Sequence, residues 1–452
     1  MATVGRCPEG SLELYKRLTC QPLTTDQAVW AVSALVTHHM KRRPRYHRKL
    51  PGRNRSPRGG HTPPYWRYPR LVRTNPFSPG AVRLPPYLVG RASQWALIEG
   101  LANQIETEGH HSPLCFLAPA GLGKTTLLKQ VGRELTQRNW LCGYAEASQD
   151  AALAIQDLLA DARQALPPEG IGARFRARLQ EFNVTAGPVG AGFKLGSLND
   201  GTAYTQLREL LTSLGELAKL DQVGVALLID EAQVLPSNAL DLLFRVVNRL
   251  DDFPIAAIMG GLPNIPNVIG NGLRSAPYVF YADLDPLSSE DARAALAEPI
   301  AAAGGQCEPS ALAHLVKFAE GHPLTLQMVG SSAWIAADRE TSPEEVPFIQ
   351  ERHAAVAIDA AQSQLTLAAY RPVWARCKKP ERRLLLALAN SMGGVQSESD
   401  LLSNLKAAMT NPEKVLDNLV GKGVVYAREE AVRFVVPGFD EFVRGRSLES
   451  HA

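Results

Sequence analysis

The sequence lacks several features that would place it in a class of protein at once. No apolar run approaches the ~18 residues that a membrane-spanning helix requires, and the first residues form no apolar signal segment. The six cysteines lie far apart, with no Cys-x-x-Cys pair and no histidine at metal-binding spacing. Because this pattern is typical of reduced thiols, we expect a cytoplasmic protein without a disulfide framework.

The overall composition excludes further classes. Apolar residues make up 45% and charged residues 21% of the 452 positions. These values exclude a disordered, a collagen-like and a disulfide-scaffold protein. At about 100–200 residues per domain, the chain has room for roughly two to four domains, each with its own core.

Acidic residues are scarce near the amino terminus. Residues 1–90 hold 16 Lys or Arg and three acidic residues, whereas the remainder has ten more acidic than basic residues. Residues 41–58 contain nine Lys or Arg and no acid. Such a run binds phosphate backbones by counterion release, or it is a solvated tail, or it is translated from a start codon set too far upstream. We expect residues 1–74 to form a basic, largely disordered arm.

Short apolar strands alternate with amphipathic helices from residue 85 onward. The predicted strands are 114–118, 140–146, 223–229, 255–260 and 278–282, and the predicted helices are 91–108, 123–135, 149–166, 203–220 and 238–250. Almost wholly apolar strands are buried on both faces, as in a parallel sheet covered by helices. Residues 167–202 are rich in Gly and Pro, and residues 181–197 within them predict an exposed β-hairpin or loop insertion.

A glycine-rich loop separates the first predicted strand from the helix after it. The pattern GxxxxGK followed by Ser or Thr falls on Ala118, Pro119, Ala120, Gly121, Leu122, Gly123, Lys124 and Thr125, with Thr126 next and Ala118 in place of the first glycine. Gly121 and Gly123 let the backbone curl so that its N–H groups point at phosphate oxygens, and the helix N-terminus adds positive potential. We expect Lys124 to reach the β- and γ-phosphates and the Thr125 hydroxyl to ligate Mg²⁺.

Two carboxylates follow the strand 223–229. Asp230 and Glu231 stand where the carboxyl edge of the sheet binds ligands in open α/β folds. We expect Asp230 to hold Mg²⁺, directly or through water, and Glu231 to polarise an attacking water. The sequence therefore predicts a protein that binds a nucleoside triphosphate with Mg²⁺ and has the parts to hydrolyse it.

These motifs resemble those of the AAA+/STAND branch of P-loop ATPases. The resemblance covers roughly residues 75–446 and is carried by DEAQ, MGGLPNIP, PPYLVGR and GHPLTLQMVGSSAW. The stretch NPFSPGAVRLPPYLVGR more narrowly resembles bacterial ATP-binding proteins of the AAA-ATPase type, and GHPLTLQMVGSSAW is similar to the GxP motif of STAND and origin-recognition-type ATPases. A Pro in the first helical turn, here Pro323, costs nothing locally.

The resemblance implies roles for further residues. It implies that Val89, Gly90 and Arg91 lie along the adenine and that Pro323 contacts the base. Arg274 stands where relatives carry an arginine that reaches a neighbour's γ-phosphate, and a surface salt bridge is the alternative. Asn264 is either a polar sensor or part of an Asn-Ile-Pro turn. His322 stands near where AAA+ relatives carry a second sensor arginine, which favours the STAND side and slow, switch-like turnover.

The last 70 residues predict a separate unit. Apolar faces indicate helices over 381–390, 399–405 and 412–420, and two strands joined at 428–430 follow. Three helices and a β-hairpin resemble a winged helix, which often reads DNA with its third helix. Residues 381–446 nevertheless hold nine basic and nine acidic residues, so DNA binding and intramolecular or partner packing both stay open.

The predicted fold class is α/β. A P-loop NTPase sheet over 75–284, covered on both faces, precedes a helical lid over 285–376 and a winged helix over 377–452. The predicted function is that of a cytoplasmic ATP-hydrolysing switch that uses Mg²⁺ and self-assembles through Arg274. The alternative is an ATP-regulated DNA-binding initiator or transcription regulator, and a further protein partner is open.

Overall fold

The computed structural model describes ten stretches of the chain. They are residues 73–80, 88–108, 112–147, 169–181, 202–250, 252–266, 279–342, 344–391, 394–428 and 430–446. Residues 1–72 of the basic arm, the predicted helix 149–166 and Arg274 lie outside the described residues.

The chain divides into two units. The larger one spans residues 73–362 and 377–452. In the other unit, the described residues are 363–376, which hold the end of α13 (Glu351–Leu365), a π-helical turn at Thr366–Tyr370 and α14 (Arg371–Arg376).

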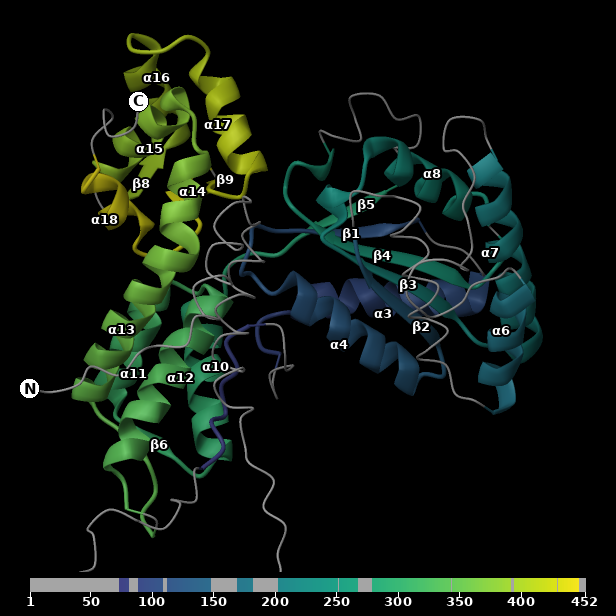
Figure 1. Ribbon diagram of the computed structural model, residues 1–452, viewed down its shortest axis with the longest axis horizontal. Helices are drawn as coiled ribbons and strands as arrows, with labels where there is room; N and C mark the ends of the chain where they lie inside the picture. The colour runs from purple at the N-terminus through teal and green to yellow at the C-terminus, as the bar shows by residue number, and fades with distance from the viewer. Residues whose placement is uncertain are drawn as a thin grey trace, which may run out of the picture. The chain divides into compact units, whose positions relative to one another are not determined.

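A parallel sheet of five strands forms the centre of the larger unit (Figure 1). The strands are β1 (Leu114–Leu117), β2 (Leu141–Glu146), β3 (Val225–Asp230), β4 (Ile255–Gly261) and β5 (Phe280–Asp283), in the order β2-β3-β4-β1-β5. Every neighbouring pair is parallel, with Leu117 opposite Gly261 and Asp283. The α/β fold class predicted from the sequence is therefore confirmed. The carboxyl ends of β1, β3 and β4 meet at one edge, where the predicted motifs begin.

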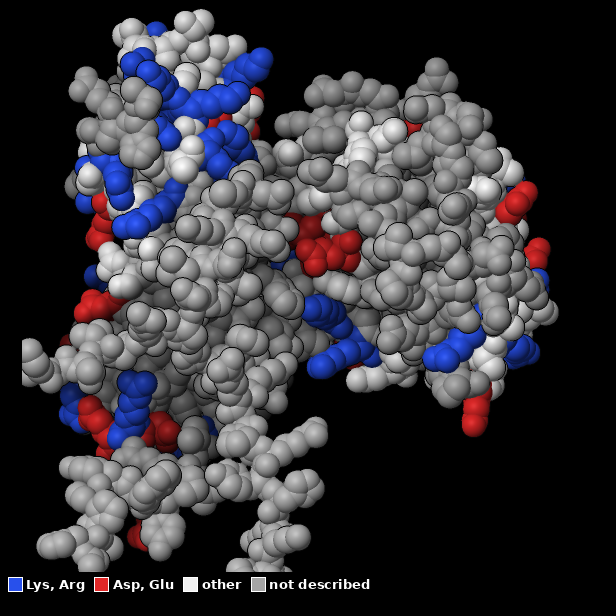
Figure 2. Space-filling model, viewed as in Figure 1, with Lys and Arg blue, Asp and Glu red and all other residues white. Residues whose placement is uncertain are grey.

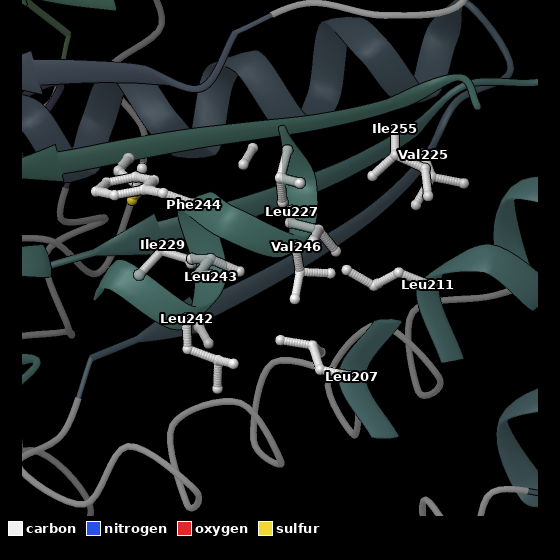
Figure 3. Packing of buried hydrophobic residues seen from close by; sticks show 14 of the residues in the cluster. Leu207, Leu211, Val225, Leu227, Ile229, Leu242, Leu243, Phe244, Val246 and Ile255 are labelled. Atoms are coloured by element: carbon white, nitrogen blue, oxygen red, sulfur yellow. The ribbon is translucent and has the colours of Figure 1, made fainter. Parts of the chain in front are cut away.

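Helices cover both faces of this sheet, because the strands are apolar on both sides. Figure 1 shows α3 (Ala92–Glu108) and α4 (Lys124–Gln137) on one face, and α6 (Gly170–Glu181), α7 (Thr202–Asp221) and α8 (Ser237–Val247) on the other. Alternate residues of β3 point to opposite faces. Ala226 and Leu228 pack in the cluster of α3 and α4, whereas Leu227 and Ile229 pack with α7 and α8. Figure 3 shows Leu207 and Leu211 of α7 near Val246 of α8, in the same cluster as Leu227 and Ile229 of β3.

Helix α6 lies in the Gly- and Pro-rich segment 167–202, where the sequence predicted no helix. The hairpin or loop insertion predicted over 181–197 lies outside the described residues, apart from Glu181. Phe175 and Leu179, one helical turn apart, are instead buried in the same cluster as Leu207 and Leu211. This burial outweighs a weak local preference, since packing of an apolar face supplies most helical stability in proteins.

Four further helices follow the sheet. They are α10 (Ser289–Ala302), α11 (Pro309–Ala319), α12 (Pro323–Glu340) and α13, and two short strands, β6 (Gln306–Cys307) and β7 (Phe348–Ile349), pair between them. The side chain of Ser288 caps α10 by accepting a hydrogen bond from the backbone N–H of Asp291. We call residues 289–362 the helical segment.

Residues 73–80 lie along α12. The Asn75 side-chain amide donates to the Ser331 hydroxyl over 2.9 Å, and the Ser78 N–H donates to the Gln327 side chain over 3.0 Å. The Phe77 ring lies against Gly330, where an added Cβ would lie 2.6 Å from the ring. The absence of a side chain at Gly330 thus creates the space for Phe77.

A C-terminal module, residues 379–446, completes the larger unit. Its elements are α15 (Lys379–Ala389), β8 (Val395–Ser397), α16 (Glu398–Lys406), α17 (Pro412–Gly421), β9 (Val425–Arg428), β10 (Ala431–Phe434) and α18 (Phe439–Arg444). The strands form an antiparallel sheet in the order β8-β10-β9. The three predicted helices and both predicted strands are present, and β8 and α18 are additional to the prediction.

Candidate functional site: a phosphate loop and a carboxylate pair

The loop between β1 and α4 has the backbone conformation that the glycines predicted. Gly121 and Gly123 adopt positive φ angles of 84° and 93°, which residues with a side chain rarely adopt. Gly123 is the N-cap of α4, no side chain caps that helix, and its first turn contains no acidic residue. An added Cβ at Gly123 would meet no atom within 4 Å. The loop therefore has an open, electropositive helix end, which fits an anion such as phosphate.

Lys124 is buried beneath this loop. Its ammonium group donates to the carbonyl oxygens of Ala118 over 2.9 Å and of Pro119 over 3.1 Å. A buried ammonium needs such acceptors, because desolvation without them costs several kcal/mol. These contacts place the positive charge within the loop, and the reach of Lys124 to the β- and γ-phosphates stays a prediction.

The structure brings Thr125 and Asp230 together across 105 positions of sequence. The Thr125 hydroxyl donates to Oδ2 of Asp230 over 2.5 Å. Oδ1 of the same carboxylate accepts the backbone N–H of Glu231 over 3.0 Å, and the Asp230 side chain is buried. The two predicted magnesium ligands thus form one site beside the phosphate loop.

The oxygen donors of Thr125 and Asp230 fit Mg²⁺. Among the described residues, no group of three or more His, Cys, Asp or Glu side chains is placed to hold a metal ion. Mg²⁺ commonly takes one or two carboxylates and completes its octahedron with water and substrate phosphates. Thr125 and Asp230 would hold such an ion next to a bound triphosphate.

Tyr144 belongs to this site, although the sequence did not single it out. Its hydroxyl donates to Oδ2 of Asp230 over 3.0 Å. Burial, and after it the nearby Asp230 carboxylate, raises the pKa of Tyr144, so the phenol keeps its proton and stays a donor. In the sequence, Tyr144 is only a polar side chain near the end of the predicted strand 140–146. Its place beside Asp230 follows from the pairing of β2 with β3, which the sequence does not give.

Glu231 stands at the same edge in an unusual backbone conformation. Its φ angle is 54°, in the left-handed region, where it caps a short 3₁₀-helix over Ala232–Val234. A residue with a side chain pays on the order of 1 kcal/mol or more for this conformation, and such strain gathers at functional sites. The half-buried Glu231 carboxylate therefore lies near Asp230 on a tightly turned segment.

The Val89-Gly90-Arg91 segment supports the phosphate loop. The buried Arg91 guanidinium donates to the carbonyl oxygens of Leu122 over 2.9 Å and of Asp285 over 2.8 Å. Gly90 has a φ of 69°, and an added Cβ there would lie 2.8 Å from Leu287. Arg91 thus joins the loop to the chain after β5. The position of these residues along an adenine stays a prediction.

The helical segment contacts the phosphate loop at the start of α12. Nε2 of His322 lies 3.3 Å from the Ala120 carbonyl oxygen, and the Leu324 N–H donates to the Gly121 carbonyl over 3.1 Å. Nδ1 of His322 lies 2.9 Å from the Thr325 hydroxyl. Burial lowers the pKa of His322 to about 4, so the ring is neutral near pH 7.

Pro323 occupies the first turn of α12, as the GxP resemblance predicted. A proline fits there because its missing N–H is one that the helix leaves unbonded. Contact of Pro323 with a base stays a prediction. Arg274 lies outside the described residues, so its role also stays a prediction.

No helix within the described ranges is long and apolar enough to cross a membrane. The described cysteines, Cys115, Cys142, Cys307 and Cys377, are all free thiols.

Comparisons with known families match two parts of the chain. Residues 87–258 match the AAA ATPase domain, and residues 368–443 match a domain of unknown function, DUF8462. The first match contains the phosphate loop and the Asp230-Glu231 pair. No curated protein matches the sequence significantly.

Solved structures share the fold at low sequence identity. The Walker-type ATPase PABY2304 of Pyrococcus abyssi is similar over 79% of this chain and 99% of its own, with 14% identity and a TM-score of 0.51. Cdc6p of Pyrobaculum aerophilum is similar over 80% of this chain and 94% of its own, with 15% identity and a TM-score of 0.40. Orc1 of Aeropyrum pernix, solved in complex with DNA, covers the same shares at 14% identity and a TM-score of 0.40.

The family match and the site geometry agree on the same stretch of sequence. The phosphate loop, Thr125, Asp230 and Glu231 meet at one edge of a five-stranded parallel sheet. Residues 87–258 therefore carry an AAA-type ATPase domain.

Proposed function

We propose that this protein is an ATP-hydrolysing molecular switch of the AAA+/STAND type. In this proposal, the helical segment is the lid over the nucleotide, and the C-terminal module is a winged helix whose arrangement depends on the nucleotide. Self-assembly through Arg274 and a cytoplasmic location belong to the same proposal.

One contact supports this proposal most strongly. An added Cβ at Gly423, in the turn between α17 and β9, would lie 3.3 Å from the Cα of Pro119 in the phosphate loop and 3.4 Å from Leu262. An added Cβ at Gly421 would lie 3.2 Å from the Cβ of Asn264. The C-terminal module therefore packs against both the phosphate loop and the loop after β4.

Apolar packing continues this contact. Tyr426 of β9 and Val435 are buried in the cluster formed by α3, α4 and the sheet, with Leu88 and Trp95 packed against it. Gly423 has a φ of 65°, so the turn that reaches the phosphate loop depends on glycine. A change in the conformation of the phosphate loop would thus alter the contacts of the C-terminal module directly.

The chain has a residue for each task in hydrolysis. Lys124 and the N–H groups of the loop would hold the phosphates, and Thr125 and Asp230 would hold Mg²⁺. The bound ion supplies charge neutralisation on the phosphate oxygens. Glu231 would orient a water and accept its proton. His322 and Leu324 would transmit the state of the loop to the lid, and Gly423 to the module.

Hydrogen exchange tests the switch. In Glu231→Gln, which should bind ATP without hydrolysing it, we expect MgATP, but not MgADP, to change exchange over residues 412–428 and to increase the mass measured by light scattering. Lys124→Ala should abolish both effects. Gly423→Ala should abolish the exchange effect while ATP still binds, because the new Cβ crowds Pro119.

A matched glycine provides the control. Gly445, at the end of α18, has a φ of −75° and room for a Cβ, so Gly445→Ala should respond as the parent chain does. Identical exchange and identical mass in all nucleotide states would contradict the switch.

A DNA-binding regulator is the second candidate. On the face shown in Figure 2, Lys and Arg side chains gather over the region of α15 to α18. Ion pairs offset part of this charge, since Lys406 lies 3.5 Å from Glu413 and Lys422 lies 2.7 Å from Glu381. Salt-dependent duplex binding that is lost in a Lys378→Glu, Lys379→Glu variant would favour this candidate. Loss only on deletion of residues 1–74 would assign the binding to the basic arm.

A further inference from the structure

Gln233 lies two residues after Glu231 and contacts it. The Gln233 side-chain nitrogen donates to Oε2 of Glu231. Both residues are half-buried, on the 3₁₀ turn that follows β3. A hydrogen bond from an amide favours the ionised form of a carboxylate and restricts its rotamer.

The other end of the same amide is also engaged. Its oxygen accepts the backbone N–H of Leu262 over 3.0 Å, directly after β4. A backbone N–H can only donate and a carboxylate can only accept, so these two partners fix which way the amide points. Gln233 therefore connects Glu231 to the end of the neighbouring strand.

The end of β4, to which Gln233 is bonded, is closely packed. An added Cβ at Gly261 would lie 3.2 Å from the Gln233 oxygen and 2.0 Å from Ile265, so the Gln233 amide lies directly against the backbone of β4. The Gly261 carbonyl accepts the N–H of Ala118 over 3.0 Å, which joins the same strand end to the phosphate loop. The backbone at the end of β4 thus contacts both Gln233, which holds Glu231, and the phosphate loop.

We propose that Gln233 is the positioning residue for Glu231: it anchors the carboxylate to the end of β4 at a fixed place relative to the phosphate loop. This inference rests on the proposed ATP hydrolysis. One carboxylate oxygen is engaged by the amide, which orients the other to accept a proton from water. The left-handed turn at Glu231 and the amide bridge together determine where that oxygen lies.

Two substitutions separate positioning from folding. Gln233→Leu keeps the approximate size but removes both hydrogen bonds, and we expect kcat to fall by about 100-fold, the cost of misplacing a reacting group by about 1 Å, with the Kd for ATP unchanged. Gln233→Glu keeps an acceptor for Leu262 but places a second carboxylate beside Glu231. Because the donor to Glu231 is lost in this variant too, kcat should fall as in Gln233→Leu, with the Kd for ATP unchanged.

The control is a glutamine with the same chemistry outside the site. Gln104 of α3 donates to Glu108 over 3.1 Å on the surface, so Gln104→Leu should keep the parent kcat and Kd for ATP. The experiment measures phosphate release from MgATP between pH 5 and 9, and ATP affinity by calorimetry, on the full chain of each variant.

The outcomes are distinguishable. A parent-like kcat in both Gln233→Leu and Gln233→Glu overturns the positioning role alone. A parent chain that binds ATP and releases no phosphate overturns the proposed hydrolysis, and the inference with it. Loss of ATP binding in both Gln233 variants also overturns the inference, because the residue would then maintain the fold of the site.

Discussion

The contact of His322 with the phosphate loop predicts a pH-dependent stability of measurable size. The ring is buried at the start of α12, next to Ala120 and Thr325, and burial lowers its pKa from 6.5 to about 4. A depressed histidine pKa means that the folded state prefers the neutral ring. The part of the folding stability that depends on the neutral His322 ring is fully present above pH 6.5. It is lost as the pH falls from 6.5 towards 4, because the unfolded chain takes up the proton first.

The magnitude follows from these two pKa values. At pH 5 the unfolded histidine is almost fully protonated and the folded one is mostly neutral. Proton linkage then lowers the free energy of unfolding by about 2 kcal/mol at pH 5 relative to pH 8. Other groups titrate over the same range, so the prediction concerns a difference between two variants.

The assay compares the parent chain with His322→Asn. Asparagine keeps an N-cap oxygen for the Thr325 N–H but does not titrate in this range. Between pH 8 and pH 5, denaturant unfolding should show a loss about 2 kcal/mol larger in the parent than in His322→Asn. His314→Asn, at a half-exposed histidine of α11, should behave as the parent does. Equal losses in the parent and His322→Asn would refute the reasoning.

Three further predictions concern other contacts. Tyr144→Phe removes the hydroxyl that donates to Asp230, so the Mg²⁺ concentration needed for tight ATP binding should rise about tenfold. ATP binding in chelator should not change. A calorimetric titration that finds the same Mg²⁺ requirement as in the parent would contradict this. Lys422→Met leaves the buried Glu381 carboxylate without its ion pair and should destabilise the chain by about 1–3 kcal/mol in thermal unfolding, a loss that should disappear when Glu381→Gln is added. Gly330→Ala crowds the Phe77 ring and should cost about 1–3 kcal/mol, whereas a parent-like melting temperature would mean that residues 73–80 do not pack there.

The sheet could be predicted from the sequence because its signals are local. Each strand is a short apolar run, and each motif lies directly after a strand. Lys124 and Asp230 could be assigned to one edge since the carboxyl ends of parallel strands meet there. The conformation of the loop could also be predicted from its glycines, because Gly121 and Gly123 do adopt the positive φ angles that the motif requires.

The missing parts depend on contacts between distant segments. Tyr144 approaches Asp230 only through the register of β2 on β3, which apolar periodicity does not determine. Gln233 meets Leu262 only after β3 and β4 pair. Helix α6 was not predicted, because its segment is rich in Gly and Pro and the partners of Phe175 and Leu179 lie in α7. Strand β8 has only three residues, too few for a periodic signal.

In the proposed function, Lys124 and Asp230 act on one magnesium-bound triphosphate. Calorimetric titration of the full chain with ATP, in Mg²⁺ and in chelator, tests it most directly. We expect one site per chain in the parent, loss of binding under both conditions in Lys124→Ala, and loss of only the Mg²⁺-dependent gain in Asp230→Asn. A parent chain that releases no heat with ATP, or two variants that bind as the parent does, would contradict the claim.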